Sequence, residues 1–148
     1  MTEIVRLGRE HISSVAQIEK LCFSDPWSES ALETLLDGDH VCLVALVDGV
    51  VAGYVGMYFV LDEGNVINVA VHPLYRRQGL ARTLLRELLT ISVDLGLAVL
   101  FLEVRESNES ARALYVSEGW EYLGKRKNYY SHPIEDAVLM IKGLVKGD

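Results

Sequence analysis

The sequence predicts an α/β fold in which helices flank a mixed, mostly antiparallel central sheet. Two apolar runs are joined by Asp48-Gly49, a strong signal for a tight hairpin and therefore for antiparallel strands. The run Ala98–Val104 is almost wholly apolar, which is typical of a strand inside a sheet. Between it and the β-branched run Val66–Val71 lie leucines at helical spacing, which predicts a strand–helix–strand unit. We expect one continuous domain over residues 1–148.

Alternation, helical spacing and turn residues predict the elements in order along the chain. We expect strands at Glu3–Leu7, Val41–Val47, Val50–Phe59, Val66–Val71, Ala98–Val104, Trp120–Leu123 and Ala137–Ile141. We expect helices at His11–Cys22, Glu29–Leu36, Leu80–Leu95 and between Asn108 and Gly119.

Residues near the ends of each helix predict where the helix begins and ends. The first helix has one apolar side made of Ile12, Val15, Ile18, Leu21 and Cys22. Pro26 ends it, because proline has no backbone N–H, and Ser28 begins the second helix. Gly96 is suited to end the third helix, while Asn108 caps the fourth and Gly119 closes it. The fourth helix directs Ala111, Leu114 and Tyr115 inward.

Composition and charge exclude several classes of protein. The chain has 148 residues, of which 50% are hydrophobic, and a mean hydropathy of +0.20, which indicates a compact globule rather than a disordered chain. No apolar stretch is long enough for a membrane span, and the acidic N-terminus lacks the apolar core of a signal peptide. The net charge of −7 argues against nucleic acid as a partner. We expect a cytoplasmic protein and take it to be a monomer.

The cysteines and histidines form no metal-binding or disulfide pattern. Cys22 and Cys42 stand in apolar surroundings without C-x-x-C spacing, so we expect two buried thiols in a reducing compartment. The four histidines are scattered along the chain without metal-ligand spacing, so no metal site is predicted.

The turn before the third helix has the features of an anion-binding site. It reads Arg-Arg-Gln-Gly-Leu-Ala over residues 76–81. The first N–H groups of a helix have no partner within the helix, and the helix dipole adds positive potential there. Gly79 allows a phosphate to approach the backbone, and Arg76, Arg77 and Arg82 add positive charge. The pattern indicates a ligand that carries a pyrophosphate.

The same turn also has a simpler interpretation. An ordinary helix can begin at a glycine and be surrounded by solvated arginines. The turn contains neither the P-loop motif nor the G-x-G-x-x-G dinucleotide motif. Taken alone, it leaves both interpretations open.

Glu103 is the acidic residue most suited to catalysis. It follows the apolar run Val99–Leu102, where a polar side chain is expected to be partly buried. Partial burial would raise the pKa of its carboxyl group and make it a candidate general base. The alternative is a glutamate at a strand end that pairs with Arg105 or another basic neighbour.

Asn108 and Tyr115 are expected to share one face of the fourth helix. They are seven residues apart, close to two helical turns. A tyrosine at this position can belong to the core with its hydroxyl group satisfied. A face that carries Asn, Ala and Tyr is polar for a core face, however, and this favours a groove.

These segments together resemble a known family. Residues 76–81 fit the Q/R-x-x-G-x-G/A acetyl-CoA motif of the GNAT superfamily of N-acetyltransferases. The remaining similarity is to its bacterial RimI branch, the ribosomal-protein alanine N-acetyltransferases, and is collinear over Phe23–Glu29, Leu61–Glu63, Asn68–Val71, Leu102–Tyr115, Asn128–Tyr130 and Glu135–Ala137. Glu118 and Trp120 depart from the branch pattern, and the spacer over residues 131–134 is shorter, which leaves the acceptor open.

The resemblance implies roles for the candidate residues. Acetyl-CoA would lie along Val69, Ala70 and Val71, with its pantetheine amides paired to the strand and to Asn108. Its pyrophosphate would meet the N–H groups of Arg77, Gln78, Gly79, Leu80, Ala81 and Arg82. Glu103 would act as the base on the acceptor amine, directly or through water, and Tyr115 would protonate the departing sulfur. Direct transfer needs no protein nucleophile, in agreement with cysteines expected far from the motif.

Three functions follow from the resemblance. The first is acetylation of a protein N-terminus, namely the alanine of a small-subunit ribosomal protein. The second keeps the fold but changes the acceptor to lysine or a small amine such as a polyamine. The third is a CoA-binding module without turnover, which an intact Glu103 and Tyr115 disfavour.

Overall fold

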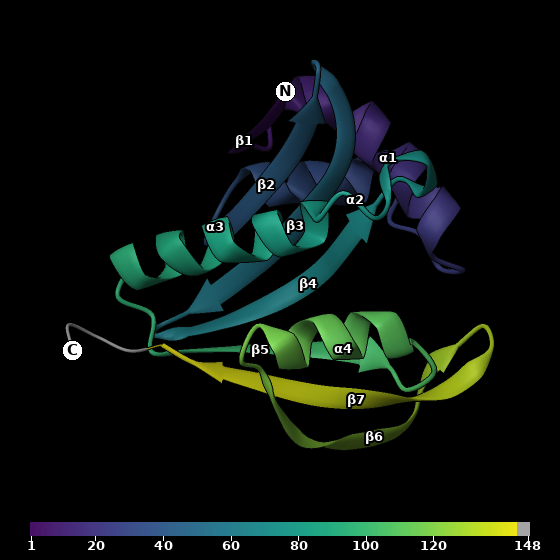
Figure 1. Ribbon diagram of the computed structural model, residues 1–148, viewed down its shortest axis with the longest axis vertical. Helices are drawn as coiled ribbons and strands as arrows, with labels where there is room; N and C mark the ends of the chain where they lie inside the picture. The colour runs from purple at the N-terminus through teal and green to yellow at the C-terminus, as the bar shows by residue number, and fades with distance from the viewer. Residues whose placement is uncertain (145–148) are drawn as a thin grey trace.

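The computed structural model describes residues 1–144 and contains one seven-stranded sheet (Figure 1). The strand order is β1-β2-β3-β4-β5-β7-β6, and all neighbours are antiparallel except β4 and β5. This arrangement confirms the predicted fold class. The strands are β1 (Thr2–Arg6), β2 (His40–Val47), β3 (Val50–Val60), β4 (Glu63–Val71), β5 (Val99–Arg105), β6 (Glu121–Ser131) and β7 (Ile134–Gly143).

Helices cover both faces of the sheet (Figure 1). They are α1 (Ile12–Cys22), α2 (Glu29–Glu33), α3 (Leu80–Asp94) and α4 (Glu109–Ser117), with single 3-10 turns at Arg9–His11, Thr34–Leu36 and Pro73–Tyr75. Residues of α1 and α2 form one apolar cluster with the sheet, and residues of α3 and α4 form the other. Within residues 1–144, no helix is long and apolar enough to cross a membrane.

The middle of the sheet is buried on both sides, as β2 illustrates. Val41, Leu43 and Ala45 belong to the α3 and α4 cluster, whereas Cys42 and Val44 belong to the α1 and α2 cluster. Successive side chains of a strand point to opposite faces, so a strand covered on both faces needs apolar residues throughout.

Two turn predictions are confirmed by backbone conformation. Asp48 and Gly49 have φ angles of 49° and 82°, as a two-residue hairpin between right-twisted strands requires. Gly96 follows Leu95, the C-cap residue of α3, and has a φ angle of 80°, a conformation that glycine adopts without steric cost.

The inward side of α1 differs from the prediction. It consists of Ile12, Val15, Ala16, Ile18 and Glu19, whereas Leu21 is 56% exposed. Leu21 lies about half a turn away from the centre of the buried stripe, because successive residues are separated by about 100° around a helix. Glu19 was not among the residues expected on this side, and it is fully buried.

The C-terminal strands are longer than predicted, and α2 is shorter. β6 covers eleven residues instead of the four at Trp120–Leu123, and Trp120 itself precedes the strand and packs against the Tyr115 ring. β6 is an edge strand, and most of its residues are exposed, so no apolar alternation marks it. Pairing with β7 establishes it instead. After Glu33, the chain continues from α2 into a 3-10 turn.

The parallel strands β4 and β5 pair only at one end. Three residues of β4, Glu63–Asn65, pair with Val99–Phe101, and beyond them the strands diverge (Figure 1). The diverging part of β4 is therefore not paired with β5. A register shift opposite Gly56 and Met57 leaves Ile67 as an extra residue in β4, and such a bulge re-aims neighbouring side chains. The candidate site occupies the opening between the two strands.

Candidate active site

Three neighbouring cavities that share lining residues occupy the opening between β4 and β5. The turn cavity, of about 600 Å³, lies beside the Gly79 turn, and the central cavity measures about 520 Å³. The hairpin cavity, of about 460 Å³, lies beside β6. Tyr115 and Asn108 border both the turn and central cavities, whereas Glu103 and Asn68 border both the central and hairpin cavities. The cavities therefore lie side by side in this opening, which we call the channel, with the two predicted catalytic residues at different points along it.

The turn cavity presents backbone donors at the start of α3. Gly79 is the cap residue of this helix, with a φ angle of 74°, and no side chain caps the helix. The N–H groups of Leu80, Ala81 and Arg82 thus lack partners within the helix. A Cβ atom built on Gly79 would meet no protein atom within 4 Å, so the space above the turn is open. This geometry is suited to a phosphate group.

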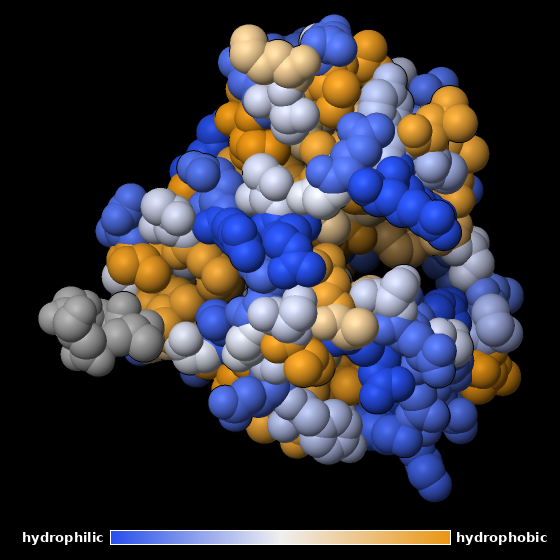
Figure 2. Space-filling model, viewed as in Figure 1, coloured by the Kyte–Doolittle hydropathy of each residue, from blue (hydrophilic) through white to orange (hydrophobic). Residues whose placement is uncertain are grey.

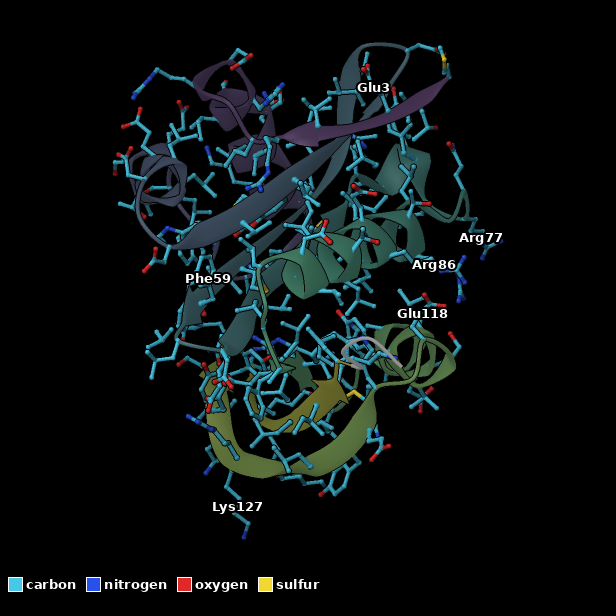
Figure 3. The ribbon with its side chains drawn as sticks, turned by 90° about the vertical axis from the view of Figure 1, so that its left-hand side faces the viewer. Glu3, Phe59, Arg77, Arg86, Glu118 and Lys127 are labelled. Carbon is cyan, nitrogen blue, oxygen red and sulfur yellow. The ribbon has the colours of Figure 1, made fainter. Side chains whose placement is uncertain are left out.

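Most of the residues predicted to contact the cofactor line the turn cavity. The turn cavity is lined by Val69, Ala70, Val71, Arg77, Gly79, Leu80, Ala81, Arg82 and Asn108. Gln78 is exposed and does not line it. Figure 3 shows Arg77 at the edge of the molecule.

Arg82 forms an ion pair with Glu118, a residue that departs from the family pattern. Glu118, at the end of α4, pairs with Arg82 and accepts a hydrogen bond of 2.8 Å from Arg86 Nε (Figure 3). Hydrogen bonds from Arg86 and Arg82 lower the pKa of the Glu118 carboxyl group. The pair joins α3 to α4 across the opening of the sheet.

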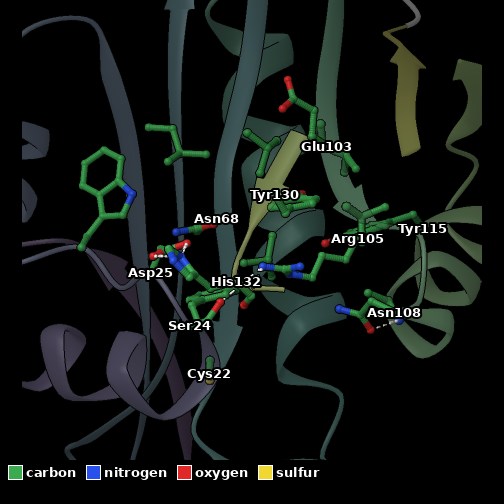
Figure 4. A pocket seen from close by; sticks show the side chains of 18 of the residues that line it. Cys22, Ser24, Asp25, Asn68, Glu103, Arg105, Asn108, Tyr115, Tyr130 and His132 are labelled. Carbon is green, nitrogen blue, oxygen red and sulfur yellow. Dashed lines mark hydrogen bonds and ion pairs between the residues drawn. The ribbon is translucent and has the colours of Figure 1, made fainter. Parts of the chain in front are cut away.

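Asn108 and Tyr115 share a face of α4, as predicted. Asn108 Oδ1 accepts the N–H of Ala111 at 3.3 Å, which leaves its Nδ2 group free to donate into the channel. Tyr115 is 7% exposed and points into the pocket (Figure 4). Burial raises the pKa of its hydroxyl group to about 12, so the hydroxyl keeps its proton at neutral pH.

Glu103 is half-buried on β5, as predicted, and Arg105, its partner in the alternative interpretation, is engaged elsewhere. Arg105 Nη1 lies 3.2 Å from Glu135 Oε1, and the guanidinium group lies 4.3 Å from the centre of the Tyr130 ring. Within residues 1–144, no ion pair involves Glu103. A hydrogen bond to Glu103 raises the pKa of the Tyr129 hydroxyl group. The carboxylate is therefore available to a ligand in the central and hairpin cavities.

Contacts between distant segments close one side of the central cavity. His132 Nδ1 in the β6–β7 turn lies 3.0 Å from Asp25 Oδ1 in the segment after α1 (Figure 4). Arg105 Nη2 lies 3.3 Å from Ser24 Oγ in the same segment. No local sequence pattern relates these residues, so the sequence does not predict them as a group.

The prediction for the cysteines is wrong for one of them. Cys42 is buried, but Cys22 is half-buried and lines both the turn and central cavities. Cys22 Sγ lies 3.5 Å from the carbonyl oxygen of Val71 and 3.5 Å from Arg76 Nη2. The end of α1 packs against the end of β4, which brings this thiol beside the motif. Within residues 1–144, no three histidine, cysteine or acidic side chains form a metal-binding group.

Comparisons with known proteins indicate one family. Residues 12–120 match the Acetyltransferase (GNAT) family. The chain is 39% identical over 133 residues to the putative ribosomal protein bS18-alanine N-acetyltransferase of Bacillus subtilis, an alignment that covers 88% of each chain. It is 36% identical over 142 residues to the ribosomal protein bS18-alanine N-acetyltransferase of Escherichia coli, covering 95% of this chain and 96% of that one.

A solved structure extends the similarity to the whole fold. The crystal structure of the ribosomal-protein-S18-alanine N-acetyltransferase from Escherichia coli matches with a TM-score of 0.92 at 34% sequence identity. The match covers 100% of this chain and 97% of that one.

Proposed function

Because the chain belongs to the GNAT family of acetyltransferases, we propose that it transfers the acetyl group of acetyl-CoA to a protein N-terminus, namely the alanine of ribosomal protein bS18. The observation that carries this proposal is the channel, in which Tyr115 borders the turn cavity and Glu103 borders the hairpin cavity. Two substrates can enter such a channel from opposite ends and meet at its centre. The substrates of the similar bacterial enzymes support the choice of acceptor.

Acetyl-CoA is proposed to bind at the turn cavity. Its pyrophosphate accepts hydrogen bonds from the free N–H groups at the start of α3. Its pantetheine arm lies along Val69, Ala70 and Val71, where β4 has diverged from β5, and pairs with the strand as an added strand does. Asn108 Nδ2 donates to the same arm. The thioester then lies in the central cavity.

The acceptor amine reaches the thioester from the hairpin cavity, beside Glu103. A peptide α-amine has a pKa near 7.7–8.0, so roughly a tenth of it is neutral at pH 7. A lysine amine, with a pKa of about 10.4, is neutral only a few times in ten thousand, a handicap of roughly 3–4 kcal/mol. One half-buried carboxylate is therefore a sufficient base for an α-amine.

The proposed reaction releases one proton to solvent overall. Glu103 removes one proton from the ammonium group and passes it to solvent, and the neutral nitrogen attacks the thioester carbon. The new C–N bond converts the carbonyl group into an oxyanion, and the surplus proton on nitrogen leaves through Glu103. Collapse of the intermediate breaks the C–S bond, and the sulfur takes the Tyr115 proton, which solvent restores.

Tyr115 acts mainly as a hydrogen-bond donor before it acts as an acid. Its pKa of about 12 exceeds the reference value of about 8.5 for a thiol, so full transfer is uphill even to the complete thiolate and goes to completion only because solvent returns a proton to Tyr115. A protonated hydroxyl group beside the sulfur stabilises that charge as it develops.

The acceptor can be tested by mass spectrometry. The enzyme is incubated with acetyl-CoA and a peptide that carries the N-terminal sequence of bS18, and we expect one acetyl group on the first residue. The same peptide with a blocked N-terminus and an internal lysine, and a polyamine, serve as competing acceptors. Preferred acetylation of either competitor would refute the proposed acceptor. If no amine is acetylated, the protein is a CoA-binding module without turnover.

A further inference from the structure

The mechanism above does not use Glu19, a carboxylate that is 0% exposed inside the molecule. It lies on the inward side of α1, and three donors reach it. The backbone N–H of Trp27 donates to Oε1 at 2.8 Å, the Tyr54 hydroxyl group donates to Oε2, and Asn68 Nδ2 donates to Oε2 at 2.9 Å. Burial raises the pKa of the Glu19 carboxyl group, and these three hydrogen bonds oppose that shift.

This arrangement determines which way the Asn68 side chain points. A carboxylate accepts hydrogen bonds and does not donate them, so the amide of Asn68 must turn its NH2 group toward Glu19. The carbonyl oxygen, Oδ1, then faces away from Glu19. Asn68 borders both the central and hairpin cavities, and in the described part of the chain no protein donor is bound to this oxygen (Figure 4).

The position of Asn68 complements that of Glu103. Asn68 belongs to β4, next to the bulge at Ile67, and Glu103 belongs to β5, across the opening of the sheet. Both side chains border the same two cavities, in which the proposed function places the acceptor amine and the thioester. A neutral primary amine has two N–H donors and one lone pair, so a fixed acceptor on one N–H group restricts where the lone pair points.

We propose that Asn68 binds the acceptor amine through Oδ1 and that Glu19 is a positioning residue that holds the Asn68 amide in this orientation. The proposal rests on the proposed function, since it assumes a primary amine as acceptor. Glu19 also holds the Trp27 backbone, and Trp27 borders the same two cavities. The Glu19 carboxylate thereby positions both the Asn68 side chain and the Trp27 backbone at the acceptor end of the channel.

The test measures peptide binding to the CoA complex, in which no acetyl group can be transferred. Calorimetry compares the affinities of two peptides. One is a bS18 peptide that begins with alanine, and the other has a propionyl group in place of that alanine and therefore lacks only the amine. Asn68→Leu should weaken binding of the amine peptide by about tenfold to a hundredfold, the range for a hydrogen bond to a charged group. It should change the affinity for the propionyl peptide and for CoA less than twofold, on the order of measurement error.

A second variant tests orientation while Asn68 remains in place. In Glu19→Gln, the Trp27 N–H still needs an acceptor, so the new amide keeps its oxygen there and places its NH2 group toward Asn68. Asn68 then turns its oxygen toward residue 19 and its NH2 group toward the channel. Both this NH2 group and the ammonium group of the peptide are donors, so no hydrogen bond forms between them. We expect the same selective loss of amine-peptide affinity as in Asn68→Leu.

Tyr54→Phe is the matched control, because it removes a donor to Glu19 and leaves the contact between Glu19 and Asn68. It should lower Tm and leave both peptide affinities unchanged. The inference is wrong if either Asn68→Leu or Glu19→Gln binds the amine peptide as the wild type does, or if both peptides weaken equally. Failure of the wild-type enzyme to acetylate the amine peptide would instead refute the proposed function, and the inference with it.

Discussion

The two ends of the channel are built in different ways. At the turn cavity, the groups proposed to bind acetyl-CoA are mainly backbone N–H groups of one short segment, which begins α3 after Gly79. Around the central and hairpin cavities, the polar groups are side chains that come from distant parts of the sequence. Asp25 and His132 are 107 positions apart, Ser24 and Arg105 are 81 apart, and Glu19 and Asn68 are 49 apart. The first kind of site depends on local conformation, and the second depends on packing of the whole fold.

The two helices that border the turn cavity sharpen this contrast. Asn108 caps the start of α4 with its own side chain, whereas α3 begins at a glycine without a side-chain cap. Capping satisfies backbone donors that would otherwise need a partner. The donors of α3 therefore remain for a ligand, whereas the Ala111 N–H of α4 is already bound to the Asn108 side chain.

The largest expected effect is at the acceptor end. Glu103→Gln keeps the shape of the side chain and removes its basicity, so kcat should fall by roughly 10²–10⁴. The affinity for CoA should stay the same, because Glu103 does not border the turn cavity. Initial rates between pH 6 and 9, together with calorimetry of CoA binding, check both parts. Turnover at the wild-type rate would reduce Glu103 to a structural residue.

Tyr115→Phe tests the boundary between the two ends. The ring packing is kept, so kcat should drop at least about tenfold, while KM for acetyl-CoA changes little. A pKa raised to about 12 lies above the assay range, so Tyr115 stays protonated throughout. The loss should therefore be equal at pH 6 and pH 9. A shift in Tm with unchanged turnover would identify Tyr115 as a core residue only.

Gly79→Ala tests the turn cavity, and Gly96→Ala is its control. Both glycines lie at ends of α3 with φ angles of 74° and 80°, and a Cβ atom at either meets nothing within 4 Å. Each variant should lose about 1–2 kcal/mol of unfolding free energy from the left-handed conformation. Only Gly79→Ala should weaken CoA binding, by about tenfold or more, because its methyl group occupies the space of the phosphate. Equal CoA affinity in the two variants would remove the anion-site argument.

Glu118→Gln should have the smallest effect. It releases Arg82 from a carboxylate, so CoA affinity should rise by about twofold to fivefold at low salt, the range for one partly exposed charge pair. The pKa of Glu118 is lowered in the folded protein, so its stabilisation is present above the unfolded pKa and is lost as the pH falls through the folded pKa. The difference in Tm between wild type and variant should therefore disappear on acidification. A Tm difference that persists in acid would contradict the ion-pair explanation.

Local patterns determined much of the fold and of the turn cavity. The Asp48-Gly49 hairpin, the end of α3 at Gly96 and the cap at Asn108 depend on residues within a few positions of one another. Backbone conformation responds to such neighbours, because steric limits on φ and the missing partners of a helix end act locally. The sequence by itself was therefore sufficient to predict these features.

Only the tertiary structure decided the rest. A glutamate in an amphipathic helix reads as solvent-facing, yet Glu19 is buried because Tyr54, Asn68 and the Trp27 backbone supply donors from other elements. Cys22 reads as distant from the motif, yet the packing of α1 on β4 places it beside Val71. A buried polar group is stable only where partners meet it, and which partners meet depends on how the whole chain packs.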